Sequence, residues 1–146
     1  MKIELHIDPS LTEPTVSIYA PSRTAEIDAL LDRLTDPAGP LLGFRSDGTA
    51  GPLELDAVLR FYGEDKAVHA QTVEGTYLIR SRLYELEQRL DGRRFVRISH
   101  SEIINLKRVT ALDLSLTGTI RVTLAGSVTT YVSRRYVRKI KEVLRL

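Results

Sequence analysis

Short apolar runs separated by turns follow one another from Leu41 to the C-terminus, and their length limits what this part of the chain can form. Runs of four to seven residues in this pattern are typical of β-strands and too short for most helices. The stretches 46–48, 73–75, 117–119 and 125–127 between them are turns by composition. We therefore predict strands near 42–45, 49–55, 58–62, 67–72, 76–79, 95–99, 109–114, 120–124 and 128–132.

Two helices interrupt and close this strand-rich pattern. Residues 81–90 place Leu83, Leu86 and Leu90 on one helical face, and Asp91-Gly92 follows as a C-terminal stop. A short helical turn is expected near 102–104. The closing helix has its apolar positions at Tyr136, Val137, Ile140, Val143 and Leu144. The predicted fold class is α+β and strand-rich, with a central helix and a C-terminal helix.

The first forty residues differ in pattern and form a predicted β-β-α appendage. Two alternating runs, 2–7 and 15–19, indicate strands that are separated by a loop containing two prolines. A helix follows, with Ser22 or Thr24 as its cap and an apolar face of Ile27, Leu30, Leu31 and Leu34. Residues 36–40, Asp-Pro-Ala-Gly-Pro, should end that helix. We therefore divide the chain into an acidic appendage, 1–40, and a main domain, 41–146.

Composition narrows the setting in which the protein works. The chain has no cysteine, which excludes a disulfide framework, a thiol nucleophile and cysteine-bound zinc. Its alternating start differs from the apolar core of a signal peptide, and no apolar run approaches the ~20 residues of a membrane span. The expected location is the cytoplasm.

The net charge of +2 hides a strong division of charge along the chain. Residues 1–75 hold 6 Lys and Arg against 13 Asp and Glu, a charge of −7, whereas residues 76–146 hold 15 against 6, a charge of +9. Basic clusters fall at 93–97, 107–108 and 134–141. Such a split indicates a polyanion-binding half, although a solvated basic surface would give the same count.

The sequence carries no signature of enzyme chemistry. It has no GxGxxG motif, no phosphate-binding loop and no HExxH motif. The three histidines, His6, His69 and His100, are far apart and share no ligand spacing. We predict no catalytic activity, no cofactor, no metal site and no small-molecule substrate.

Within the basic half, residues 93–106 hold Phe95, a basic residue two positions on, the pair His100-Ser101, then an aliphatic residue and Asn105. This motif resembles the central signature of the LytTR DNA-binding domain family. The family pattern also fits the helical stretch 83–87 before the motif, the hairpin after it and the closing stretch 133–140. It fits the opening stretch 59–64 moderately well. The resemblance covers roughly residues 41–146.

The resemblance implies a fold of small antiparallel sheets and sequence-specific binding to double-stranded DNA. In the family, two loops enter successive major grooves, and the DNA bends between them. Carried over, the base contacts fall on His100 and Arg135. The family's first loop falls near 66–68, where a residue that is often polar is replaced by Ala67 or Val68, and Lys66 is the candidate that would substitute for it. The candidates for phosphate contacts are Arg97, Ser101, Ser133 and Arg134.

Structural interpretations stand beside these assignments. His100 would cap a turn at 102–104, and Arg135 would pair with Glu142 two helical turns on. Asn105 is expected to bond backbone within its turn. Most of the aromatic residues fit core or amphipathic positions better than positions that would stack on bases. They are Phe61, Tyr62, Phe95, Tyr77, Tyr84, Tyr131 and Tyr136.

The resemblance is to stand-alone regulators, because residues 1–40 are too short for a receiver domain. It implies binding to repeated operator sites as a homodimer, and control by a small membrane protein that acts as an inhibitor. The helix with the Ile27 face would dimerise, dock on that partner or cover the β-domain. An RNA-binding β module and a protein-interaction module with an acidic partner are the alternatives, the former expecting aromatics exposed on a sheet.

Overall fold

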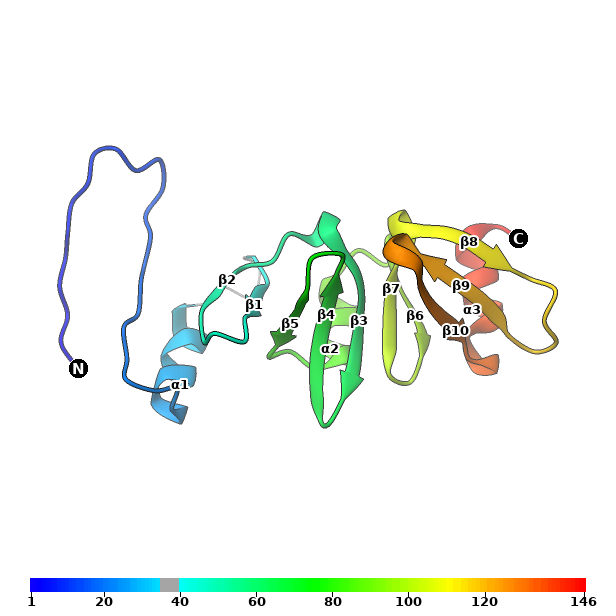
Figure 1. Cartoon of the computed structure of the whole chain (residues 1–146), viewed down its shortest axis with the longest axis horizontal. Coiled ribbons are helices and arrows are strands. Elements are labelled where there is room, and N and C mark those ends of the chain that lie inside the picture. The colour runs from blue at the N-terminus through cyan, green and yellow to red at the C-terminus, as the bar shows by residue number, and fades with distance from the viewer. Residues whose placement is uncertain (35–39) are drawn as a thin grey trace. The chain divides into compact units, whose positions relative to one another are not determined.

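The computed structural model of the chain describes residues 1–34 and 40–146. It divides into two compact units, Met1–Thr35 and Asp36–Leu146 (Figure 1). The predicted helix stop at 36–40 lies, except for Pro40, outside the described residues. None of the described helices is long and apolar enough to cross a bilayer.

The first unit contains one helix, α1 (Ala25–Leu34), and no strand among its described residues. The Thr24 hydroxyl accepts a hydrogen bond from the Ile27 amide at 3.3 Å, so Thr24 caps the helix as predicted. The two strands predicted at 2–7 and 15–19 do not form in the single chain. A two-stranded ribbon without a further strand or a covering layer is at best marginally stable in water, and this unit supplies neither.

The second unit is built around an antiparallel seven-stranded sheet with the order β2-β1-β5-β4-β3-β7-β6. Most strands that pair in this sheet are consecutive in the sequence. The two exceptions are the pairing of β5 with β1 and the pairing of β7 with β3. The helix α2 (Leu83–Arg89) connects β5 to β6. The strands are β1 (Leu42–Phe44), β2 (Ala50–Pro52), β3 (Val58–Glu64), β4 (Ala67–Thr72), β5 (Thr76–Ile79), β6 (Phe95–Ser99) and β7 (Glu102–Asn105).

A three-stranded antiparallel sheet, β10-β9-β8, and the closing helix α3 (Arg134–Leu144) complete the unit. Its strands are β8 (Val109–Asp113), β9 (Ile120–Leu124) and β10 (Val128–Val132). The short 3-10 helices Leu55–Ala57, Leu106–Arg108 and Ala125–Ser127 each lead into the strand that follows. The observed fold is therefore the strand-rich α+β fold with antiparallel sheets that the sequence predicted.

Residues 102–105 form strand β7, so the helical turn predicted near 102–104 is wrong. All four residues of the strand are buried, and it pairs with β3 on one side and β6 on the other. Tertiary pairing on both edges satisfies the backbone as a strand, whereas a single helical turn would leave buried groups unbonded. The turn that His100 was expected to cap does not exist.

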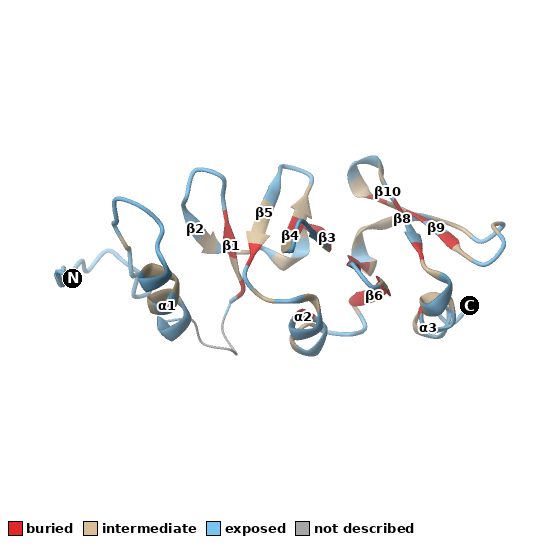
Figure 2. Cartoon of the chain, turned by 90° about the horizontal axis from the view of Figure 1, so that it is seen from below, coloured by how far each residue is buried: buried red, intermediate tan, exposed pale blue. Residues whose placement is uncertain are grey.

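Two apolar cores lie on opposite faces of the seven-stranded sheet near β7. The first includes Phe61, Leu86 and Ile103 and is covered by α2, whereas the second includes Ile104 and packs against the three-stranded sheet and α3. Successive residues of a strand point to opposite faces, so Ile103 and Ile104 serve different cores. Figure 2 shows buried residues along these strands, while α1 buries none of its own.

We expect Leu86→Ala to lower the free energy of unfolding by about 2–5 kcal/mol, because it opens a cavity in a fully buried contact of α2. Tyr84, in the same helix, is 54% exposed, and Tyr84→Ala should change stability by no more than about 0.5 kcal/mol. Urea titration followed by circular dichroism measures both variants. Equal losses would mean that α2 is not anchored through Leu86.

Candidate nucleic-acid interface

Three loops that carry the predicted contact residues lie at one end of the second unit. They are the β3–β4 turn, the β6–β7 turn and the β10–α3 junction (Figure 1). The Gly63 amide donates to the Ser101 carbonyl at 2.8 Å, which joins the first two. The Ser133 amide donates to the Ile98 carbonyl, also at 2.8 Å, which joins the last two. These two hydrogen bonds span 38 (101 − 63) and 35 (133 − 98) positions, so segments far apart in the sequence meet at this end of the sheet.

The β3–β4 turn presents Lys66. Asp65 and Lys66 have φ of 52° and 62°, the left-handed conformation at both central positions that makes a two-residue type I′ hairpin. Lys66 is exposed, and its neighbours Glu64 and Asp65 are exposed as well. The turn is therefore mixed in charge, and its cation stands beside two carboxylates.

The β6–β7 turn presents His100 and Ser101, both exposed. Arg97 holds this turn from inside: its Nε donates to the Ser99 carbonyl at 3.0 Å, and its Nη2 donates to the His100 carbonyl. The Arg97 side chain is only 11% exposed, and Glu87 of α2 lies 3.6 Å from its Nη1. Arg97 thus shapes the loop, whereas His100 projects from it.

The β10–α3 junction presents two exposed arginines, Arg134 and Arg135, after Ser133. The Arg134 guanidinium lies against the β8–β9 loop, where a Cβ added to Gly118 would sit 3.1 Å from Nη2. Gly118 has a φ of +76°, so the loop uses both the small size and the left-handed conformation of glycine. The alternative pairing of Arg135 with Glu142 does not form; Glu142 instead forms an ion pair with Arg138, whose Nε lies 3.5 Å from its Oε1.

Other charged and polar groups near these loops are engaged within the protein. The Ser115 hydroxyl donates to Asp113, which lowers the pKa of that carboxyl group, and the ionised carboxylate pairs with Arg121 at 2.7 Å. Asn105 is fully buried, donates to the Val58 carbonyl at 2.8 Å and accepts from the Lys107 amide at 3.0 Å. The structural interpretation of Asn105 is therefore confirmed.

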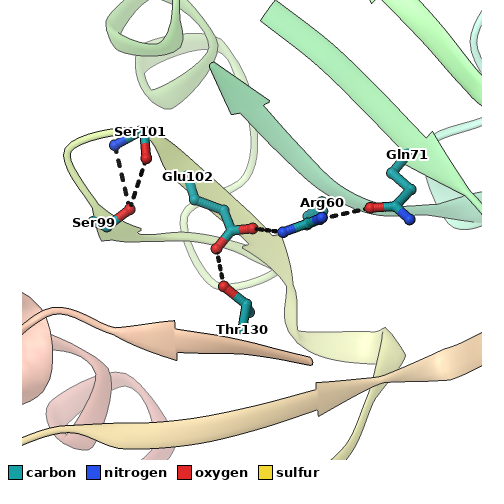
Figure 3. A network of polar contacts seen from close by, with 6 residues as sticks. All are labelled: Arg60, Gln71, Ser99, Ser101, Glu102 and Thr130. Atoms are coloured by element: carbon teal, nitrogen blue, oxygen red, sulfur yellow. Dashed lines mark hydrogen bonds and ion pairs between the residues drawn. The ribbon is translucent and has the colours of Figure 1, made fainter. Parts of the chain in front are cut away.

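A buried polar network behind the loops was not predicted from the sequence. Glu102, the first residue of β7, is 5% exposed and binds both Arg60 of β3 and Thr130 of β10 (Figure 3). Arg60 also donates to Gln71 of β4 at 2.6 Å. The sequence offered one signal for this network, a carboxylate directly before two isoleucines at 102–104. It could be recognised only if residues 102–105 were identified as a buried strand.

No metal centre is indicated in the part of the chain that the structure describes, because no three His, Asp or Glu side chains gather there. Beside the exposed carboxylates of Glu64 and Asp65, the loop end presents exposed hydrogen-bond donors and cations, namely Lys66, His100, Ser101, Arg134 and Arg135. Such groups suit phosphate oxygens and the edges of bases.

We expect Arg97→Ala to loosen the β6–β7 turn. The Ser101 amide, which donates to the Ser99 hydroxyl at 3.2 Å, should exchange its hydrogen about tenfold faster, because charged hydrogen bonds contribute about 1.5–3 kcal/mol each. Arg93 is exposed, and Arg93→Ala is the matched control with unchanged exchange. Nuclear magnetic resonance measures these rates, and equal rates in both variants would show that Arg97 does not hold the turn.

Comparison with known proteins identifies the family and agrees with the fold. The LytTr DNA-binding domain pattern matches residues 51–145. Uncharacterised HTH-type transcriptional regulators of Staphylococcus aureus strains NCTC 8325 and RF122 are each 34% identical over 146 residues, covering 99% of this chain and 98% of the relative. A solved LytTr DNA-binding domain from a Bacillus cereus response regulator is 21% identical, with a TM-score of 0.69, and covers 74% of this chain and 99% of its own. The chain belongs to the LytTr DNA-binding domain family.

Proposed function

We propose that the protein is a transcription regulator that binds a specific double-stranded DNA sequence through loops. The observation that carries the proposal is the meeting of three loops, each with an exposed donor, at one end of the domain, joined by the Gly63–Ser101 and Ser133–Ile98 backbone hydrogen bonds. Membership of the LytTr DNA-binding domain family supports duplex DNA as the ligand. In this role the protein acts in the cytoplasm, needs no cofactor and performs no chemistry.

Base contacts are assigned to the exposed side chains at the loop tips. Arg135 stands at the first turn of α3, and a guanidinium there suits bidentate bonding to the O6 and N7 atoms of guanine. His100 offers an imidazole that donates or accepts at a base edge. Lys66 reaches out from a rigid two-residue turn and serves a base or a phosphate in the adjoining groove.

Phosphate contacts are assigned to Ser101, Ser133 and Arg134, which flank the base-contacting residues. Such contacts fix the register of the protein on the duplex without specifying sequence. Arg97 has an indirect role in this proposal. Its Nε and Nη2 donate hydrogen bonds to the Ser99 and His100 carbonyls, and little of its side chain is exposed. It sets the position of the phosphate-binding and base-contacting groups at 99–101.

Loops rather than a recognition helix enter the DNA in this proposal, although the staphylococcal relatives carry helix-turn-helix in their names. A helix-turn-helix needs two consecutive helices, whereas strands separate α1, α2 and α3 in the described parts of the chain. Loops from the two sheets would reach successive major grooves, and bending of the DNA between them would add sequence preference at uncontacted positions.

Selection from a random duplex pool tests the proposal. We expect a recurring motif that is bound more tightly than scrambled DNA by about 4 kcal/mol or more, with an affinity that falls as salt rises. Binding that is purely electrostatic, so that it depends on the salt concentration but not on the DNA sequence, would contradict the proposal. Tight binding to single-stranded RNA or to an acidic protein instead would favour the two alternative functions.

We expect Arg135→Ala to weaken binding to the selected site by about 1–3 kcal/mol and to relax the preference at one base position. His100→Ala should relax a different position. Arg145 is exposed near the opposite end of α3, so Arg145→Ala removes the same charge away from the loops and should cost no more than about 0.5 kcal/mol. Competition binding on single-base variants of the site measures these effects. Equal losses for both arginines would mean that net charge, not contact, matters.

We further propose that residues 1–40 join two copies of the chain, with 41–146 as the DNA-binding domain. The alternating apolar side chains Ile3, Leu5 and Ile7 are 80–86% exposed in one chain, and the segment forms no strand there. Pairing with the same segment of a second copy would complete a sheet and bury this face.

Sedimentation of the full chain against a variant with Ile3, Leu5 and Ile7 changed to Ser tests this role. We expect a dimer that becomes a monomer in the variant, because three apolar side chains would no longer be buried, each contributing about 1.5–3 kcal/mol. A wild-type monomer would contradict the dimer. It would leave the segment to another partner, such as the small membrane protein that the family resemblance implies.

A further inference from the structure

The Glu102 side chain hydrogen-bonds into both sheets of the second unit. Its two carboxylate oxygens have different partners: Oε1 accepts from Arg60 Nη1 of the seven-stranded sheet, and Oε2 accepts from the Thr130 hydroxyl of the three-stranded sheet (Figure 3). Thr130 is 8% exposed, so this second bond is buried on both sides.

The other end of the network is fixed within the seven-stranded sheet. Arg60 lies directly across from Gln71 on β4, donates to it at 2.6 Å and stacks its guanidinium 4.6 Å from the Tyr62 ring centre. Tyr62 in turn lies across from Glu102 on β7. The carboxylate is therefore held in place by neighbours on β3 and β4 before it reaches Thr130.

Both ends of the Glu102–Thr130 bond lie close to the DNA-contacting loops. Glu102 follows Ser101 directly, and Thr130 is three residues before Ser133 on the strand that leads to the β10–α3 junction. The bond thus connects the loop that carries His100 to the strand that leads into the β10–α3 junction, where Arg135 lies in the first turn of α3.

We propose that Glu102 is a positioning residue that fixes the distance between the β6–β7 turn and the β10–α3 junction, and through it the spacing of the bases that the protein recognises. This inference rests on the proposed function. The physical reason is directional: the apolar contacts of the second core tolerate small slides between the sheets, whereas a buried hydrogen bond to a carboxylate tolerates few.

A buried carboxylate also makes the alternative arrangements costly. If the two sheets slide apart, Oε2 loses its donor in a place that water does not reach, and an unsatisfied charged group is penalised more than a lost apolar contact. With apolar residues in place of Glu102 and Thr130, the Ser133–Ile98 backbone hydrogen bond and the nondirectional apolar contacts of the second core would be left to set the spacing of the two loops.

Thr130→Val tests the inference, because it keeps the volume of the side chain and removes the hydroxyl. Thr130→Ser restores the hydroxyl, and Thr129→Val makes the same change at an exposed neighbour on β10. Glu102→Gln is the second variant should Thr130→Val unfold; it keeps the volume and a bonding group toward Thr130 but removes the charge.

The first readout uses no DNA. The chain has no cysteine, so His100→Cys with Arg135→Cys gives two unique sites for spin labels, one on each loop. Electron paramagnetic resonance should show one narrow distance distribution in the parent, in Thr130→Ser and in Thr129→Val. Thr130→Val should broaden or shift it, and Glu102→Gln should do so to a smaller extent. An unchanged distribution in the valine variant, or in the glutamine variant if it is needed, would overturn the inference.

The second readout uses the unlabelled proteins and the selected DNA site. Thr130→Val should lose about tenfold in affinity for that site, the equivalent of one charged hydrogen bond, while its affinity for scrambled DNA and its salt dependence stay unchanged. When one base pair is added between the two contacted groups of bases, the DNA site should lose less affinity for Thr130→Val than for the parent. Equal loss on both DNAs would show a merely structural effect and overturn the inference. Failure of the parent to select any site would instead overturn the proposed function, and the spin-label distances would still decide whether Glu102 positions the loops.

Discussion

The rest of the second unit depends on strand β7, the middle one of three adjacent strands, β3, β7 and β6, that each contribute to both apolar cores. Ile103 points into the core under α2, and Ile104 points into the core shared with the three-stranded sheet and α3. The strand has partners on both edges, β3 and β6, so its backbone is satisfied without water. A slip of one residue would send each isoleucine to the wrong face, which fixes the register.

That register also places the polar groups. With Ile104 in the second core, Glu102 faces the same side at the rim, where the Thr130 hydroxyl meets it, while Asn105 faces the other side and bonds the Val58 carbonyl. The loops on either side of these anchors inherit their positions. Rigid strands that carry exposed loop residues are a common way to build a binding site, because the framework limits the entropy lost on binding.

Local sequence patterns predicted most of the fold and the exposed tips of the site. The strands from β1 to β10 other than β7 lie within a few residues of their predicted positions, because short alternating runs between turns leave little choice. His100, Ser101 and Arg135 were assigned through the family signature and do lie exposed at one end. Arg97 was predicted from the sequence as a phosphate contact, and only the fold shows that its guanidinium donates to the Ser99 and His100 carbonyls.

By itself, the sequence determined the strand-rich class, the two helices of the main domain, the basic half and the absence of enzyme motifs, since these follow from periodicity, composition and charge. Only the tertiary structure decided that 102–105 is a strand, that the runs at 2–7 and 15–19 stay unpaired in one chain, and that Glu102 joins Arg60 to Thr130. The reason is sequence separation. Arg60 and Thr130 lie 42 and 28 positions from Glu102, so their meeting depends on sheet pairing and burial that no local window of the chain records.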